Sequence, residues 1–137
     1  MDLDQFKRIN KIAKITSITD FRIQSYDGVD LLVTGGFDFA YYHQVEVEFI
    51  KVSYMSLLTY FNYPIFRIAS IEEADLISNL IHLEEEDIVY CVEAEMNSKT
   101  NEQVFYVVAQ EVTIKKGTVF YYEREKLQEN KRIASWI

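Results

Sequence analysis

The spacing of apolar residues follows a helical period at the start of the chain and a strand period over most of the rest. An N-terminal helix is predicted over residues 2–14, because one apolar stripe repeats at helical spacing through Leu3, Phe6, Ile9 and Ala13. From Asp20 onward apolar and polar residues alternate, which is typical of a strand with one buried face. We therefore expect a chain that consists mainly of strands after one short helix.

Turn residues divide the alternating part of the chain. Gly28 and the pair Gly35-Gly36 end the first two strands, because glycine tolerates the positive φ of tight turns. The apolar phase flips after Phe49, which predicts a β-bulge near Phe49-Ile50. Hairpin connections are predicted at the polar residues 96–102 and at Lys115-Lys116-Gly117. The expected strands begin at Asp20 and then occupy residues 30–34, 44–54, 65–68, 88–95, 103–114, 118–124 and 133–137, with Trp136 as a core anchor.

A second helix is predicted over residues 71–81. Ser70 and Glu73 have the spacing of a capping box, in which each side chain bonds the backbone N–H of the other residue. One face of this helix is apolar and should meet the core, while the opposite face is acidic and should face water. The apolar residues are Ala74, Ile77, Leu80 and Ile81, and the acids are Glu72, Glu73 and Asp75.

Two helices and about seven strands in meander order predict the α+β class, with a mainly antiparallel sheet curled into a sandwich or partial barrel. The length of 137 residues and the lack of a linker predict a single domain over residues 1–137. Exposed strand edges would also allow the chain to form homo-oligomers.

The formal net charge of −8 is unevenly distributed. Residues 1–19 carry +2 and residues 115–137 carry +3, so residues 20–114 hold −13. Such an acidic surface repels phosphate backbones, which disfavours nucleic acid as a partner, and it attracts a basic protein partner. The alternative is that the acids only keep the surface soluble. The partner-binding residues predicted from this region are Glu72, Glu73, Asp75, Glu84, Glu85, Glu86 and Asp87.

The single cysteine, Cys91, lies in an apolar run, which favours a buried small hydrophobic residue over a reactive thiol. One cysteine excludes an intramolecular disulfide and a multi-cysteine metal site. The sequence has no signal-peptide pattern and no apolar run near the ~20 residues that span a bilayer. We therefore expect a cytoplasmic protein that binds no membrane, no cofactor and no metal.

The two histidines lack a partner at the spacing of a known catalytic motif. A His-dependent enzyme that pairs His43 with Asp38 or Glu46 is therefore the least favoured of three hypotheses, and no catalytic residue is assigned. The second hypothesis is a curled sheet that encloses a small apolar ligand and carries polar groups at its mouth. The ligand-binding candidates are Tyr41, His43, Arg67 and Tyr121.

Ten tyrosines, some in adjacent pairs such as Tyr41-Tyr42 and Tyr121-Tyr122, favour the remaining hypothesis of protein recognition. Neighbours on a strand face opposite ways, so one ring of each pair should lie outside the core. We therefore expect a non-catalytic protein-binding domain with an acidic, tyrosine-rich surface.

A family resemblance gives this hypothesis a more specific form. It is carried by the strand texture of Phe21-Arg22-Ile23, Tyr26-Asp27-Gly28, residues 30–33 and residues 41–49. With these segments, residues 20–70 resemble small bacterial immunity-type domains found beside polymorphic toxins, and also uncharacterised Gram-positive proteins of similar length. The resemblance implies a non-enzymatic protein that neutralises a cognate partner, and it assigns no role to any single residue.

Overall fold

A computed structural model describes residues 6–7, 10–11, 18–95 and 103–137 of the chain. Nine strands and the helix α2 (Ile71–Ser78) are formed in this part. The strands are β1 (Asp20–Tyr26), β2 (Leu31–Gly36), β3 (Tyr42–Ile50), β4 (Tyr54–Met55), β5 (Tyr60–Ile68), β6 (Ile88–Glu95), β7 (Gln103–Ala109), β8 (Glu111–Phe120) and β9 (Lys131–Ile133).

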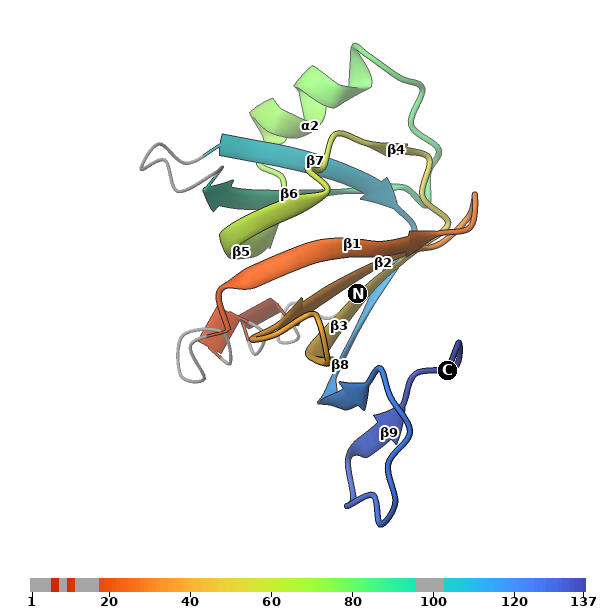
Figure 1. The fold of residues 1–137 in the computed structure, drawn as a ribbon. Helices are drawn as coiled ribbons and strands as arrows, with labels where there is room; N and C mark the ends of the chain where they lie inside the picture. The colour runs from red at the N-terminus through yellow and green to blue at the C-terminus, as the bar shows by residue number, and fades with distance from the viewer. Residues whose placement is uncertain (1–5, 8–9, 12–17, 96–102) are drawn as a thin grey trace.

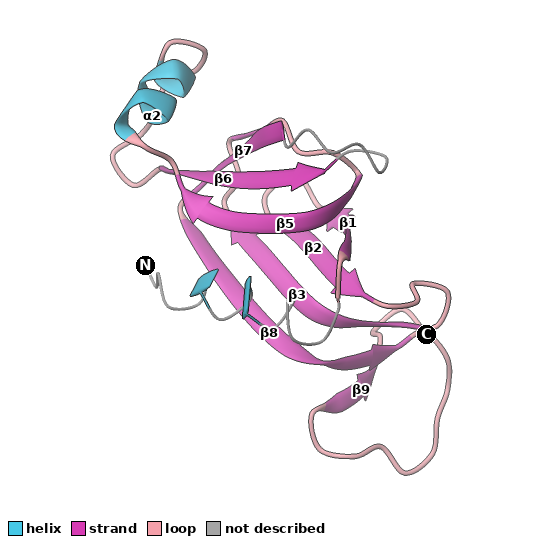
Figure 2. Cartoon of the chain, turned by 90° about the vertical axis from the view of Figure 1, so that its left-hand side faces the viewer, coloured by secondary structure: helices cyan, strands magenta, loops and turns pink. Residues whose placement is uncertain are grey.

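All nine strands belong to one sheet, in the order β4-β7-β6-β5-β1-β2-β3-β8-β9. Neighbouring strands are antiparallel, except that β9 runs parallel to β8. Only Gln110 separates β7 from β8, although these strands lie near opposite edges of the sheet order. The sheet must therefore curl on itself, as Figures 1 and 2 show, and the N–H of Gln110 closes the bend by bonding the carbonyl of Ile50 at 2.9 Å.

Aromatic rings fill the inside of the curl. Phe21, Phe49, Phe61 and Tyr90 are fully buried there, and Phe66 is nearly so. Their rings pack with centroids 5.5–6.1 Å apart in stacked and edge-on pairs, which adds to the gain from burying their area. In β3 every second side chain is buried, and these side chains contribute to the same core.

The predicted α+β class is wrong, because the described chain is mostly β and forms one mixed sheet with α2 as a single short helix. Of the expected N-terminal helix 2–14, only residues 6–7 and 10–11 are described; they are helical, and the rest lies outside the described residues. The second helix begins where predicted but ends at Ser78 instead of residue 81, and Leu80 points into water rather than into the core.

The predicted turn at Lys115-Lys116-Gly117 is also wrong. Gly117 does adopt a positive φ of 138°, but inside a bulge of β8: His43 pairs with Val119 and Val45 with Lys116, so β8 carries one extra residue. The strand therefore continues to Phe120. The other hairpin connection, residues 96–102, lies outside the described residues.

Two further details differ from the expectation. The phase flip after Phe49 is no bulge, because β3 ends at Ile50 and Lys51, with φ 57°, turns the chain toward β4. The last strand is Lys131–Ile133 rather than residues 133–137, and Trp136 is 55% exposed instead of anchoring the core.

Candidate functional site

The acidic region predicted to bind a partner forms α2 and the segment that follows it, against β6 and β7 (Figures 1 and 2). Ile77 is the buried residue of the helix and packs with Val89 and Val108. The capping box is confirmed: the Glu73 N–H donates to the Ser70 hydroxyl at 3.2 Å, and the Ser70 N–H donates to the Glu73 carboxylate at 2.9 Å. The cap fixes where α2 starts and so where its acids lie.

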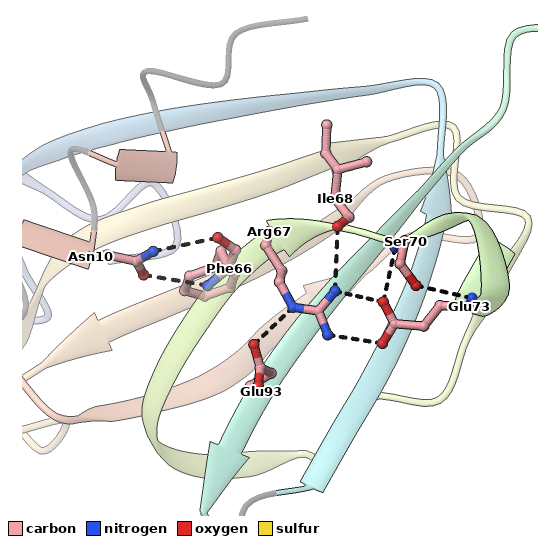
Figure 3. Close-up of polar contacts among 7 residues, drawn as sticks. All are labelled: Asn10, Phe66, Arg67, Ile68, Ser70, Glu73 and Glu93. Carbon is pink, nitrogen blue, oxygen red and sulfur yellow. Dashed lines mark hydrogen bonds and ion pairs between the residues drawn. The ribbon is translucent and has the colours of Figure 1, made fainter.

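Arg67 joins α2 to the sheet (Figure 3). Its Nη1 and Nη2 donate to both carboxylate oxygens of Glu73, at 2.6 and 2.8 Å, and its Nε donates to Glu93 at 2.7 Å. The bidentate contact with Arg67 lowers the pKa of Glu73 to about 2, and the same contact raises the pKa of Arg67. The negative charge of Glu73 is therefore compensated by Arg67 within the fold. This leaves Glu73 less available to a partner than the other acids of this region.

Five of the seven acids predicted to bind a partner are exposed: Glu72, Asp75, Glu84, Glu85 and Glu86. Asp87 is half-buried and accepts the N–H of Glu84 at 2.9 Å, which holds the turn after α2. The sequence did not indicate that three large aliphatic side chains lie exposed among these acids. They are Ile71 at 83%, Leu76 at 54% and Leu80 at 63% exposure. We call these eight exposed residues the α2 surface.

The four residues predicted to bind a ligand separate into two places. Arg67 lies in the network of α2, far along the sheet order from the other three. Tyr41, His43 and Tyr121 do come together: the Tyr121 N–H donates to the carbonyl of Tyr41 at 2.8 Å, and the Tyr121 hydroxyl lies 2.6 Å from His43 Nδ1. This group lies where β3 begins and β8 ends.

His43 is fully buried, and both of its ring nitrogens are bonded. Nε2 lies 2.8 Å from a carboxylate oxygen of Glu46, whose other oxygen accepts a hydrogen bond from Arg132 of β9. The bonds from His43 and then Arg132 lower the pKa of Glu46, while burial raises the pKa of Tyr121. A chain of hydrogen bonds thus connects Tyr121, His43, Glu46 and Arg132, and it ties the C-terminal strand to β3.

This network brings together one of the pairs considered for an enzyme, His43 with Glu46. Asp38, the other candidate, instead accepts the N–H of Ala40 in the loop after β2. A general base must reach a substrate, whereas the imidazole of His43 has no exposed area and no free ring nitrogen. The arrangement supports a role in holding strands together. The sequence did not indicate that Arg132 belongs to this network, because Arg132 lies 86 residues from Glu46 and no local spacing pattern connects the two residues.

In the part of the chain that the structure describes, no group of three or more His, Cys, Asp or Glu could hold a metal ion. Within the same residues, no helix is long and apolar enough to cross a membrane. No protein-family model, curated protein or solved structure matches the chain. The fold and these sites define a curled mixed β-sheet protein with one acidic and aliphatic helix on its outside.

Proposed function

We propose that the chain is a non-catalytic, cytoplasmic protein-binding domain whose α2 surface binds a basic protein. An immunity or inhibitor role, in which the bound partner is a toxin-like protein, is the most specific form of this proposal. The observation that carries it is the exposure of Ile71 and Leu76 on α2, and of Leu80 just after it, among exposed acids. Large aliphatic side chains clustered on a surface and rimmed by polar groups mark interaction sites.

The two kinds of side chain have different tasks in such an interface. The aliphatic residues supply affinity, since burying one of them under a partner removes apolar area from water. The exposed carboxylates supply the rate and the choice of partner, because they attract a basic surface and repel an acidic one. The proposed binding should therefore weaken as salt is added, which screens the exposed charges.

The Arg67 network also supports the proposal. The bidentate ion pair holds α2 to the sheet, and the capping box fixes where the helix starts. The helix therefore presents its side chains in one fixed arrangement, which lowers the entropy lost on binding. The exposed tyrosine pair lies away from α2, because the rings of Tyr41 and Tyr122 pack on each other beside β3 and β8. The proposed interface is acidic and aliphatic rather than tyrosine-rich.

The apolar-ligand hypothesis has less support than protein binding. The rings of Phe21, Phe61 and Tyr90 fill the inside of the sheet, with no exposed area. A ligand placed there would have to displace them, at the cost of their packing.

A capture experiment tests the proposal. The purified chain is immobilised, exposed to a lysate of its native host, and washed at low and at high salt. The variant E84K/E85K/E86K reverses three charges of the α2 surface, and L76S/L80S removes two aliphatic side chains that the fold leaves exposed. The matched control is E123K/E125K/E129K, which reverses three exposed acids in the loop between β8 and β9.

We expect one basic protein to be retained at low salt by the unchanged chain and by the control, and to be lost with either α2 variant. Binding of the purified partner by calorimetry then gives the affinity. The proposal fails if no protein is retained at low salt, or if the retained protein binds the α2 variants as well as the control.

A further inference from the structure

A cavity of about 190 Å³ is lined by residues of β8, by residues at the start of β9 and by Glu46 of β3. β8 and β9 lie at the end of the sheet far from α2 (Figure 1). One water needs roughly 10–15 Å³ of such volume, so the cavity has room for a group of several atoms. Its shape depends on Gly117, where a Cβ would lie 2.5 Å from the carbonyl oxygen of Asn130. Asn130 itself has a φ of 66°, and it leads directly into β9. The backbone is thus folded closely around the cavity on two sides.

Cationic residues make up four of the nine residues that line this cavity. The lining contains Lys115, Lys116, Lys131 and Arg132, and one carboxylate, Glu46. A protein with a net charge of −8 therefore gathers four exposed cationic residues around one concave place, where a bound anion would reduce their mutual repulsion.

Glu46 does not neutralise the three lysines. Its carboxylate accepts from Arg132 and contacts buried His43, and these bonds lower its pKa so that it is ionised at neutral pH. The strand register places Lys115 opposite Glu46, yet among the described residues no ion pair joins Lys115, Lys116 or Lys131 to any carboxylate. The lining keeps an uncompensated positive charge.

A second cavity, of about 230 Å³, shares Glu46, Lys115 and Arg132 with the first. Its remaining walls are apolar or uncharged, apart from Glu48, and include the half-exposed ring of Trp136. An indole ring offers a flat face on which a planar group can stack. The pair of cavities therefore has room for an anionic head beside the lysines and for a neutral body beside Trp136.

We propose that the cavity between β8 and β9 binds a phosphoryl group of a small molecule, held by Lys115, Lys116 and Lys131. Lys115 and Lys116 of β8 and Lys131 of β9 line the same cavity, and lysines gathered in one place match a small anion of more than one negative charge. The source is either a free inorganic anion, which fills the first cavity alone, or a phosphorylated molecule with a ring that extends to Trp136.

The chain contains one tryptophan, so its fluorescence reports on Trp136 alone. Purified protein is titrated at low salt with inorganic pyrophosphate and, separately, with adenosine monophosphate; calorimetry measures binding and fluorescence measures the effect on Trp136. The variant K115Q/K116Q/K131Q removes the proposed ligands. K51Q is the control, since Lys51 is an exposed lysine outside both cavities. Circular dichroism and thermal unfolding check that each variant is folded.

We expect saturable binding of at least one probe, weakened by about tenfold or more in the triple variant and unchanged in K51Q. Tighter binding of the nucleotide with quenching at Trp136 identifies a ring-bearing phosphorylated ligand. Equal or tighter binding of pyrophosphate without a change at Trp136 identifies a free anion. The proposal is overturned if neither probe saturates, if the folded triple variant binds like the unchanged chain, or if K51Q weakens binding equally.

Discussion

The ion-pair network of Arg67 offers the sharpest test of how α2 is held to the sheet. Replacing Arg67 by methionine keeps an unbranched apolar stem but removes three charge-assisted hydrogen bonds, two to Glu73 and one to Glu93. A bond to a charged group contributes about 1.5–3 kcal/mol when it is buried, and an exposed pair about 0–1 kcal/mol. The side chains of Arg67, Glu73 and Glu93 are 32%, 20% and 26% exposed, which is between these limits. We expect R67M to lower the free energy of unfolding by about 2 kcal/mol at pH 7.

The pKa of Glu73 determines how this loss depends on pH. In the folded chain the pKa is about 2, against an ordinary value of 4.5, so the carboxylate stabilises the fold fully above pH 4.5. That contribution disappears as the pH falls from 4.5 through 2, because over this range the unfolded chain binds the proton while the folded chain does not. In R67M the carboxyl has lost its main partner and titrates nearer its ordinary value. The stabilities of the two proteins should therefore converge as the pH falls over this range.

The assay is urea unfolding followed by circular dichroism at pH 7 and at steps down to pH 3, with R67M, E73Q and the double variant. Glutamine at position 73 keeps the capping box, so the double-mutant cycle isolates the ion pair. We expect a coupling of about 1 kcal/mol at pH 7 that shrinks with acid. E72Q is the control, since Glu72 is an exposed neighbour without a bonded partner. If R67M costs no more than E72Q, or if its cost is the same at pH 3 as at pH 7, the network does not hold α2.

Three further outcomes follow from buried groups and are measured on the purified chain. Gly35→Ala should cost about 1–3 kcal/mol in urea unfolding, or prevent folding, because its Cβ would lie 2.4 Å from the fully buried ring of Phe21; an unchanged midpoint would contradict this close packing. Burial raises the pKa of the Cys91 thiol to about 12. A thiol reagent at pH 8 should therefore react only as fast as the folded chain opens and exposes Cys91, and rapid labelling would show instead that the thiol is accessible. Tyr121→Phe should cost about 1 kcal/mol by leaving His43 with one unbonded ring nitrogen, and a stability equal to that of the unchanged chain would show that the hydrogen bond contributes nothing.

The features that the sequence predicts well are local. The alternation in β3 and the spacing of Ser70 and Glu73 depend on residues a few positions apart, and both appear in the structure as expected. The extent of α2 could not be obtained in the same way. Leu80 fits the apolar stripe of a longer helix, but whether a residue of that stripe meets the core depends on tertiary packing: Leu80 is exposed, whereas Ile81 packs against the cluster of Ile77.

The features that the sequence misses depend on pairing between distant segments. Gly117 has the local signature of a hairpin turn, but its structure is decided by a distant segment. β3 pairs with β8 on both sides of this glycine, so the strand absorbs it as a bulge. The same holds for the candidate ligand group. His43 meets Tyr121 across 78 residues, whereas Arg67 meets Glu93 across 26 and so belongs to a different site. Residue type made these side chains candidates for one ligand site, but only the strand order shows that they belong to two separate places.

The strand order also keeps the two proposed sites independent. The helix α2 lies against β6 and β7, whereas β8 and β9, whose residues line the cationic cavity, lie at the far edge of the sheet (Figure 1). Opposite charges placed so far apart on one chain do not neutralise each other, because interactions beyond about 8 Å are largely screened at physiological salt. Each proposed site would therefore keep its own selectivity, one for a basic protein and one for a small anion. Reversing charges on α2 should leave the binding of pyrophosphate unchanged, and removing the three lysines should leave the capture of a basic partner unchanged.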